Sequence, residues 1–226
     1  MESIKHYLFP SLILEKHDSN FPAVKSAVQA TIFQHMKNGF SSEETGHVDL
    51  HLDSNFKQLF EFASSAISDY ISTFAADPEI FDWYVVKSWA NIIKNRGNPT
   101  HNHADAHLSF VYYINIPSEI ETPIIFHNNP NRYEPFHGFS RWNSKSFDVL
   151  NSGIWKFVPV EGQILVFPAA MAHETPRVSN TPDPGVKDYT DLTKHRFSIA
   201  GDVIITYKDP TSNPLGLQPI TNWRKF

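Results

Sequence analysis

The sequence predicts a mainly antiparallel β domain that carries a layer of helices near its N-terminus. Three observations lead to this fold class. Short segments rich in β-branched and aromatic residues follow one another after Pro78, turn-forming residues separate them, and two segments before Pro78 repeat apolar residues at helical spacing. Many short strands joined by turns favour an antiparallel sandwich or barrel over a parallel βαβ sheet.

The first 80 residues are predicted to be mainly helical support for the β core. Residues 21–36 repeat apolar side chains every three or four positions, and Asn20 followed by Pro22 is typical of a helix start. Residues 56–74 repeat the same apolar pattern. The sequence therefore predicts two helices, separated by a polar stretch.

After Pro78 the period of the apolar pattern changes from that of helices to that of strands. Turn-forming residues at 95–99, 128–131, 161–162 and 181–185 punctuate this region. The predicted strands are residues 83–93, 108–116, 123–126, 154–158, 163–167 and 197–207.

Two long polar segments, residues 136–152 and 176–194, are interpreted as surface loops that border a functional pocket. No linker interrupts the chain. We therefore expect a single domain over residues 1–226, with a β core at 81–210 and a C-terminal tail at 211–226.

The composition excludes several kinds of site. The chain has no cysteine, which rules out disulfides, zinc–thiolate sites, iron–sulfur clusters and a cysteine nucleophile. A net charge of −5 argues against nucleic acid or an anionic membrane as a partner. No apolar run approaches the ~20 residues of a membrane helix, and the N-terminus lacks the features of a signal peptide. We therefore expect a cytoplasmic protein.

A cluster of histidines precedes the strand predicted at 108–116. His101, His103, Asp105 and His107 alternate along the chain, and residues two apart share one face of an extended segment. Imidazoles and a carboxylate that converge in this way suit a transition metal such as iron. The alternative is a polar loop that contains histidines without binding a metal.

A second histidine-bearing segment follows the strand predicted at 163–167. His173 comes five residues after Pro168, where it could act as a remote third ligand. Taken alone, a partly buried histidine with a hydrogen bond is the commoner interpretation.

The last strand begins with a candidate anion site. Arg196 and Ser198 are two residues apart, so their side chains share one face of the strand. A guanidinium beside a hydroxyl suits a carboxylate, which accepts two hydrogen bonds from arginine. The alternative is an internal ion pair with an Asp or Glu of the protein itself.

Several short motifs stand in a fixed order along almost the whole chain. They are Leu8-Phe9-Pro10, Trp89-x-Asn91, His101-x-His103, Ser109-x-Val111-Tyr112-Tyr113, Pro159-x-x-Gly162, Phe167-Pro168, His173 and Arg196-x-Ser198. This ordered set resembles the Fe(II)- and 2-oxoglutarate-dependent dioxygenase superfamily. It is most similar to the 2-oxoglutarate/Fe(II) oxygenases of T4-like marine phages and bacteria.

The resemblance implies a double-stranded β-helix, the cupin-like jelly roll, with iron held by His103, Asp105 and His173. It also implies that Arg196, helped by Ser198, anchors the distal carboxylate of 2-oxoglutarate. The similar group often shows no Asp where Asp105 stands here, so a set with His101 in place of His103, or a set of three histidines, stays open.

Four further residues are assigned around this centre. Neighbouring residues of a strand point to opposite faces, so either Tyr112 or Tyr113 must point inward. We assign Tyr112 and Asn91 to the cosubstrate, and Tyr113 and His107 to the substrate side.

The resemblance further implies an oxidoreductase that uses O2 and allows ascorbate as a reductant. We expect it to hydroxylate a peptidyl or small-molecule substrate, as a monomer or homodimer, in the cytoplasm of the host cell if it is phage-encoded. Two alternatives remain. One is a cupin-type dioxygenase or isomerase that does not use 2-oxoglutarate, and the other is a non-catalytic jelly-roll binding module. A three-histidine site, together with an Arg196 paired with a protein carboxylate, would favour the cupin.

Overall fold

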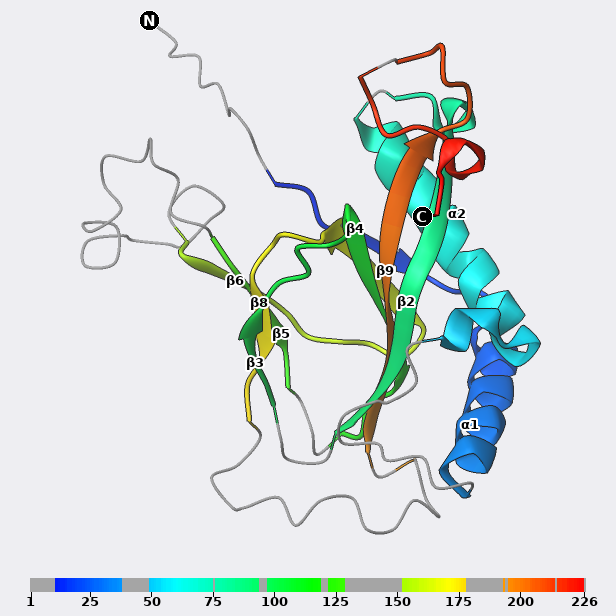
Figure 1. Ribbon diagram of the computed structural model, residues 1–226. Coiled ribbons are helices and arrows are strands. Elements are labelled where there is room, and N and C mark those ends of the chain that lie inside the picture. Colours follow the sequence, from blue (N-terminus) through cyan, green and yellow to red (C-terminus); the bar gives the residue numbers. More distant parts are fainter. Residues whose placement is uncertain are drawn as a thin grey trace, which may run out of the picture.

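A computed structural model shows two antiparallel β-sheets that face each other, with two helices on the outer side of one of them (Figure 1). The larger sheet has five strands in the order β1-β7-β4-β9-β2, and the smaller sheet has four in the order β3-β8-β5-β6. The structure describes residues 11–37, 49–74, 76–93, 97–118, 122–128, 152–177, 193, 195–213 and 215–225.

The five-stranded sheet is buried on both faces at its centre. Its strands are β1 (Leu14–His17), β2 (Phe81–Ile93), β4 (Leu108–Asn115), β7 (Gln163–Pro168) and β9 (Arg196–Tyr207). Every residue of β4 is buried. The long strands β2 and β9 pair along their whole length, from Phe81 opposite Tyr207 to Ile93 opposite Arg196.

The four-stranded sheet contains shorter strands. They are β3 (Asn98–His101), β5 (Ile124–His127), β6 (Ile154–Phe157) and β8 (His173–Thr175). Val111 and Tyr113 of β4 pack with Phe126 and Phe167 in the core between the sheets. The alternate residues Phe110, Tyr112 and Ile114 pack in the other core, together with residues of the helices.

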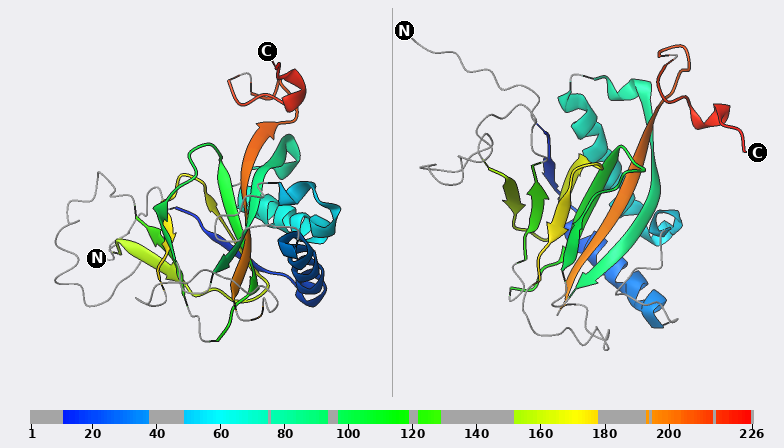
Figure 2. Two further views of the ribbon diagram at one scale, coloured as in Figure 1. Left: turned by 60° about the horizontal axis from the view of Figure 1, so that its bottom comes forward. Right: turned by 60° about the vertical axis from the view of Figure 1, so that its left-hand side comes forward.

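The helices cover the outer face of the five-stranded sheet (Figure 2). Helix α1 (Phe21–Lys37) and helix α2 (Lys57–Thr73) bury the apolar sides that their sequences predict. Three short turns of 3-10 helix, η1 (Leu50–Leu52), η2 (Ser54–Phe56) and η3 (Pro78–Ile80), join these elements, and η5 (Ile220–Asn222) lies near the C-terminus. The buried helical residues are Val24, Val28 and Ile32 of α1 and Leu59, Ala63, Ala66, Ile67, Tyr70 and Ile71 of α2.

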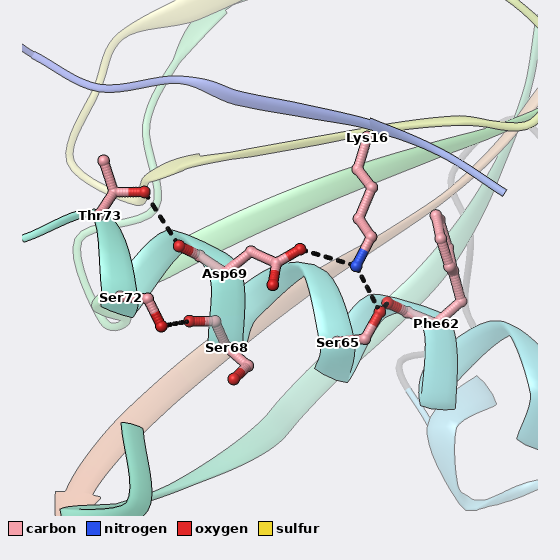
Figure 3. A network of polar contacts seen from close by, with 7 residues as sticks. All are labelled: Lys16, Phe62, Ser65, Ser68, Asp69, Ser72 and Thr73. Atoms are coloured by element: carbon pink, nitrogen blue, oxygen red, sulfur yellow. Dashed lines mark hydrogen bonds and ion pairs between the residues drawn. The ribbon is translucent and has the colours of Figure 1, made fainter. Parts of the chain in front are cut away.

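Polar contacts fasten the edge strand β1 to α2 (Figure 3). The Nζ of Lys16 lies 2.7 Å from the carboxylate of Asp69 and donates a hydrogen bond to the hydroxyl of Ser65 at 3.0 Å. Lys16 also lies over the ring of Phe62, 5.7 Å from its centroid. The lysine therefore covers part of an apolar surface while its charge is paired.

The β core with its helical layer confirms the predicted fold class, and all six predicted strands and both helices are present. The strands β1, β3 and β8 were not predicted, because they have four residues or fewer and are mostly polar. The Leu8-Phe9-Pro10 motif and most of the two predicted long loops lie outside the described residues. In the part of the chain that the structure describes, no helix is both long and apolar enough to cross a membrane.

Candidate metal centre and the adjoining cavity

Three histidine side chains meet at one end of the four-stranded sheet. His101 ends β3 and lies opposite His173, the first residue of β8, while His103 follows two residues after His101. Each histidine offers one nitrogen, and the three nitrogens all lie within 4.8 Å of one another. This spacing allows the three nitrogens to bind one metal ion.

The hydrogen bonds of the rings define which nitrogens face a metal. The Nδ1 of His101 lies 2.7 Å from the carbonyl oxygen of Pro99, and the Nδ1 of His173 lies 2.9 Å from that of Met171. The Nδ1 of His103 lies 3.1 Å from a carboxylate oxygen of Asp202. These acceptors favour the tautomer with hydrogen on Nδ1, which leaves the Nε2 lone pair of each ring for a metal.

His173 is held in the neutral form that metal binding requires. Its residue is 7% exposed, and burial lowers the pKa of His173 to about 4. The neighbouring rings of His101 and His103 also lower this pKa, because a second positive charge beside them is unfavourable. At neutral pH the imidazole of His173 therefore keeps its lone pair.

Aromatic side chains support two of the rings. Trp89 of β2 stacks on His103, with ring centroids 5.4 Å apart, and Phe167 contacts the ring of His173 edge-on at 5.0 Å. These contacts restrict ring rotation, which preorganises the site.

The shared face predicted for His101, His103, Asp105 and His107 ends at His103. The chain turns at Ala104 and Asp105, so the alternation of an extended segment no longer applies. Asp105 is exposed and is not part of the group of close ligand atoms. The structure therefore brings together the three histidines of the open alternative, and it does not bring Asp105 to them.

His107 also lies away from the three rings. Its side chain is exposed, and its Nδ1 accepts a hydrogen bond from the backbone nitrogen of Ile205 at 2.8 Å. The residue therefore ties the start of β4 to β9, and the structure does not place it on the substrate side.

A cavity between the sheets connects the three histidines with the predicted anion site. Arg196 is 3% exposed, and its Nε and Nη1 have no hydrogen-bond partner among the described residues. Ser198 lies between Asn91 of β2 and Tyr113 of β4 in the sheet register. The residues that line the cavity include Trp89, Asn91, His101, His103, Tyr113, His173, Arg196 and Ser198.

Of the two neighbouring tyrosines of β4, Tyr113 and not Tyr112 faces the cavity. The hydroxyl of Tyr112 donates to the carboxylate of Asp18 at 2.8 Å on the helical side of the sheet, so it cannot reach the cavity. Tyr113 lines the cavity, and its ring lies 5.5 Å from the guanidinium carbon of Arg196. Burial raises the pKa of Tyr113, and the nearby guanidinium opposes part of that rise.

Asp202 is the residue near the site that sequence reasoning missed. It is 5% exposed and lies on β9, on the same face as Arg196 and Ser198. An acidic residue inside the apolar run 197–207, at an even spacing from Arg196, was the signal that could have identified it.

One family model matches the part of the chain that contains the three histidines. Residues 87–183, which include all three histidines, match the family model described as "Putative 2OG-Fe(II) oxygenase". A comparison with curated protein sequences gives no match to this chain.

Solved structures with the same fold include a non-haem epimerase and a non-haem monooxygenase. The α-ketoglutarate-dependent epimerase SnoN from nogalamycin biosynthesis aligns with a TM-score of 0.53 at 12% identity, over 88% of this chain and 82% of that one. The non-haem monooxygenase ThoJ in complex with nickel gives a TM-score of 0.52 at 14% identity, over 89% of this chain and 76% of that one. AviO1 from Streptomyces viridochromogenes Tue57 gives a TM-score of 0.52 at 9% identity, over 86% of this chain and 90% of that one.

These similarities assign the two sheets to the jelly-roll fold of the 2OG-Fe(II) oxygenases. Together with the match at residues 87–183, they show that the chain is similar to 2OG-Fe(II) oxygenases in part of its sequence and in its fold. The description of the matched family names Fe(II) and 2-oxoglutarate (2OG).

Proposed function

We propose that this protein is an Fe(II)- and 2-oxoglutarate-dependent oxygenase in which His101, His103 and His173 hold the iron and Arg196 anchors 2-oxoglutarate. The observation that carries the proposal is the position of Arg196. A buried guanidinium with two nitrogens that have no hydrogen-bond partner among the described residues lines the same cavity as the three histidines. Leaving such a group without an anion is costly, so the site suits an anionic ligand.

The donor set fits a divalent transition metal. Three neutral imidazoles with close nitrogens supply three ligand positions, and imidazole is a good ligand for iron. A three-ligand site leaves further positions open for cosubstrate and oxygen. The resemblance to the phage and bacterial group is compatible with such a set, because that group often lacks an Asp at the position of Asp105.

The donors around Arg196 fit the distal carboxylate of 2-oxoglutarate. Arg196 offers a bidentate fork, and the hydroxyl of Ser198 lies two residues further along the same face of β9. Tyr113 contributes a buried phenol that also has no hydrogen-bond partner among the described residues. Asn91 lies opposite Ser198 in the register and lines the same cavity.

The protein's own groups then have distinct tasks. When bound, iron supplies the oxygen activation that couples 2-oxoglutarate decarboxylation to substrate oxidation. The three histidines fix the metal at one end of the cavity, while Arg196 and Ser198 hold the far carboxylate and thereby orient the other end of the cosubstrate toward the metal. Phe126 and Phe167 pack beside His173 and keep water from that side of the site.

Hydroxylation of a peptidyl or small-molecule substrate is the proposed outcome. The net charge of −5 gives the protein no general attraction for nucleic acid, which disfavours that substrate class. The similar structures are named as an epimerase and a monooxygenase, so the fold accommodates more than one oxidative outcome.

A cupin-type enzyme without 2-oxoglutarate is the second candidate, because one specific observation favours it. The three-histidine set is the ligand arrangement expected for such a cupin. The other expected feature is missing: in the described part of the chain, no carboxylate pairs with Arg196. The unpaired arginine therefore favours the 2-oxoglutarate-dependent function.

Succinate formation tests the proposal. Purified protein with Fe(II), 2-oxoglutarate and oxygen should form succinate slowly by itself and faster with its true substrate, and the Arg196→Leu variant should form little. A wild-type protein that binds iron but forms no succinate with any tested substrate, and whose iron centre ignores 2-oxoglutarate, would support the cupin instead.

A further inference from the structure

Asp202 is a buried acid in the middle of an apolar strand. It lies between Gly201 and Val203 of β9 and is 5% exposed. Removing a carboxylate from water costs several kcal/mol unless hydrogen bonds or charges compensate it. The position therefore requires specific partners.

Both carboxylate oxygens of Asp202 have partners, and they differ in kind. One oxygen accepts a hydrogen bond from the hydroxyl of Ser109 at 2.8 Å, and Ser109 lies directly opposite Asp202 in the β4–β9 register. The other oxygen lies 3.1 Å from the Nδ1 of His103. Asp202 thus links the central strands of the sheet to one of the three histidines.

The acceptors behind the other two rings are neutral. His101 and His173 use the backbone carbonyls of Pro99 and Met171, whereas His103 uses a carboxylate. A carboxylate behind a metal-bound imidazole fixes the ring orientation and raises its basicity. It also brings a negative charge, which three neutral imidazoles do not supply to a divalent cation.

We propose that Asp202 is the positioning residue of the metal centre: through His103 it turns Nε2 toward the cation and supplies the negative charge of a three-histidine site. This inference rests on the proposed metal site and deepens it. Asp202 takes over the electrostatic part of the role that the sequence assigned to Asp105, but without being a ligand. Asp105 is exposed and carries neither the contact nor the burial that the role needs.

Metal affinity measured with manganese(II) alone tests the inference, because it needs neither 2-oxoglutarate nor substrate. The Asp202→Asn variant keeps the size of the side chain and removes its charge, and it should bind manganese(II) about 10–100-fold more weakly than wild type. Asp209→Asn is the matched control, since it removes the same charge from the exposed turn after β9 and should leave the affinity unchanged.

Ser109→Ala separates positioning from a merely structural role. It removes the hydrogen bond that ties Asp202 to β4 but leaves the carboxylate beside His103. If Asp202 acts only by joining the strands, Ser109→Ala and Asp202→Asn should weaken metal binding alike. The inference predicts that Asp202→Asn weakens manganese(II) binding about 10–100-fold, whereas Ser109→Ala weakens it less than about 3-fold.

A direct readout comes from nitrogen NMR of the histidine rings in the metal-free protein. His103 should carry its hydrogen on Nδ1 in wild type and become a mixture of tautomers in Asp202→Asn. Should that variant fail to fold, a wild-type His103 found with hydrogen on Nε2 would still overturn the inference. Equal manganese affinity of wild type and Asp202→Asn overturns it as well, while leaving the proposed function intact. A wild-type protein that binds no metal overturns both.

Discussion

The two faces of the five-stranded sheet differ in how their polar groups are satisfied. On the helical face, the hydroxyl of Tyr112 is paired with Asp18, and its ring contacts Phe21 and Phe62. On the cavity face, the neighbouring Tyr113 and the guanidinium of Arg196 keep polar atoms without partners in the described part of the chain. Buried polar groups are nearly always paired in proteins. The difference therefore separates a face built for stability from a face built to receive a ligand.

The largest expected effect on the cavity face is that of His173→Ala. Loss of a group behind a metal ligand costs about 10–100-fold in affinity, so loss of a ligand should cost more than ~100-fold. Isothermal titration with iron(II) under nitrogen measures this loss. A His173→Ala variant that binds iron with the wild-type affinity and stoichiometry would remove the metal centre from the cavity face.

The next effect concerns the cosubstrate. Arg196→Leu should raise the Kd of 2-oxoglutarate by the equivalent of about 2–5 kcal/mol, the cost of truncating one partner of a buried charge-assisted pair. Iron binding should persist, because the three histidines are unchanged. Titration of the manganese(II)-loaded protein with 2-oxoglutarate measures this Kd. An unchanged Kd in Arg196→Leu would favour the cupin-type candidate.

The pH dependence of stability gives a smaller effect with a definite sign. The pKa of His173 is lowered to about 4 in the folded protein, whereas an unfolded histidine titrates near 6.5. Between these values the unfolded chain binds the extra proton, so the stability of the metal-free protein falls as pH drops from ~6.5 to ~4. The loss amounts to roughly 3 kcal/mol if the full shift applies.

Urea unfolding at several pH values, compared between wild type and His173→Gln, isolates this contribution. Between pH 6.5 and 4, the free energy of unfolding should fall less steeply with decreasing pH in the variant than in wild type. If both proteins lose stability equally over this range, other groups cause the loss and His173 is not held neutral by its surroundings.

The smallest effects compare the two tyrosines directly. Tyr112→Phe removes a satisfied hydrogen bond and should lower the free energy of unfolding by about 1 kcal/mol without changing 2-oxoglutarate affinity. Tyr113→Phe should leave the free energy of unfolding unchanged and raise the Kd for 2-oxoglutarate by roughly 3–10-fold. Opposite results for the pair would mean that the two faces have been assigned the wrong way round.

The sequence predicts the parts of this structure that depend on local pattern. Helical spacing identified α1 and α2, and alternation along β9 placed Arg196 and Ser198 on one face. Periodicity could not decide between Tyr112 and Tyr113, because both faces of β4 are buried. That choice depends on where the helices pack.

The site itself was predictable only in part. His101, His103 and His173 were all candidates, but their meeting depends on the pairing of β3 with β8, two short strands far apart in sequence. Asp105 and His107 do not share a face with His101 and His103, because a turn after His103 breaks the alternation of an extended segment. Asp202 was missed because its partners, Ser109 and His103, lie about a hundred positions away.

The central claim is that three histidines, rather than two and Asp105, hold the iron beside the anion site. Anaerobic titration of iron(II) and 2-oxoglutarate tests it most directly, since the chelate gives a weak visible charge-transfer band only when both bind together. The band should survive in Asp105→Ala and be lost in His101→Ala. Loss of the band in Asp105→Ala, with the band retained in His101→Ala, would contradict the account.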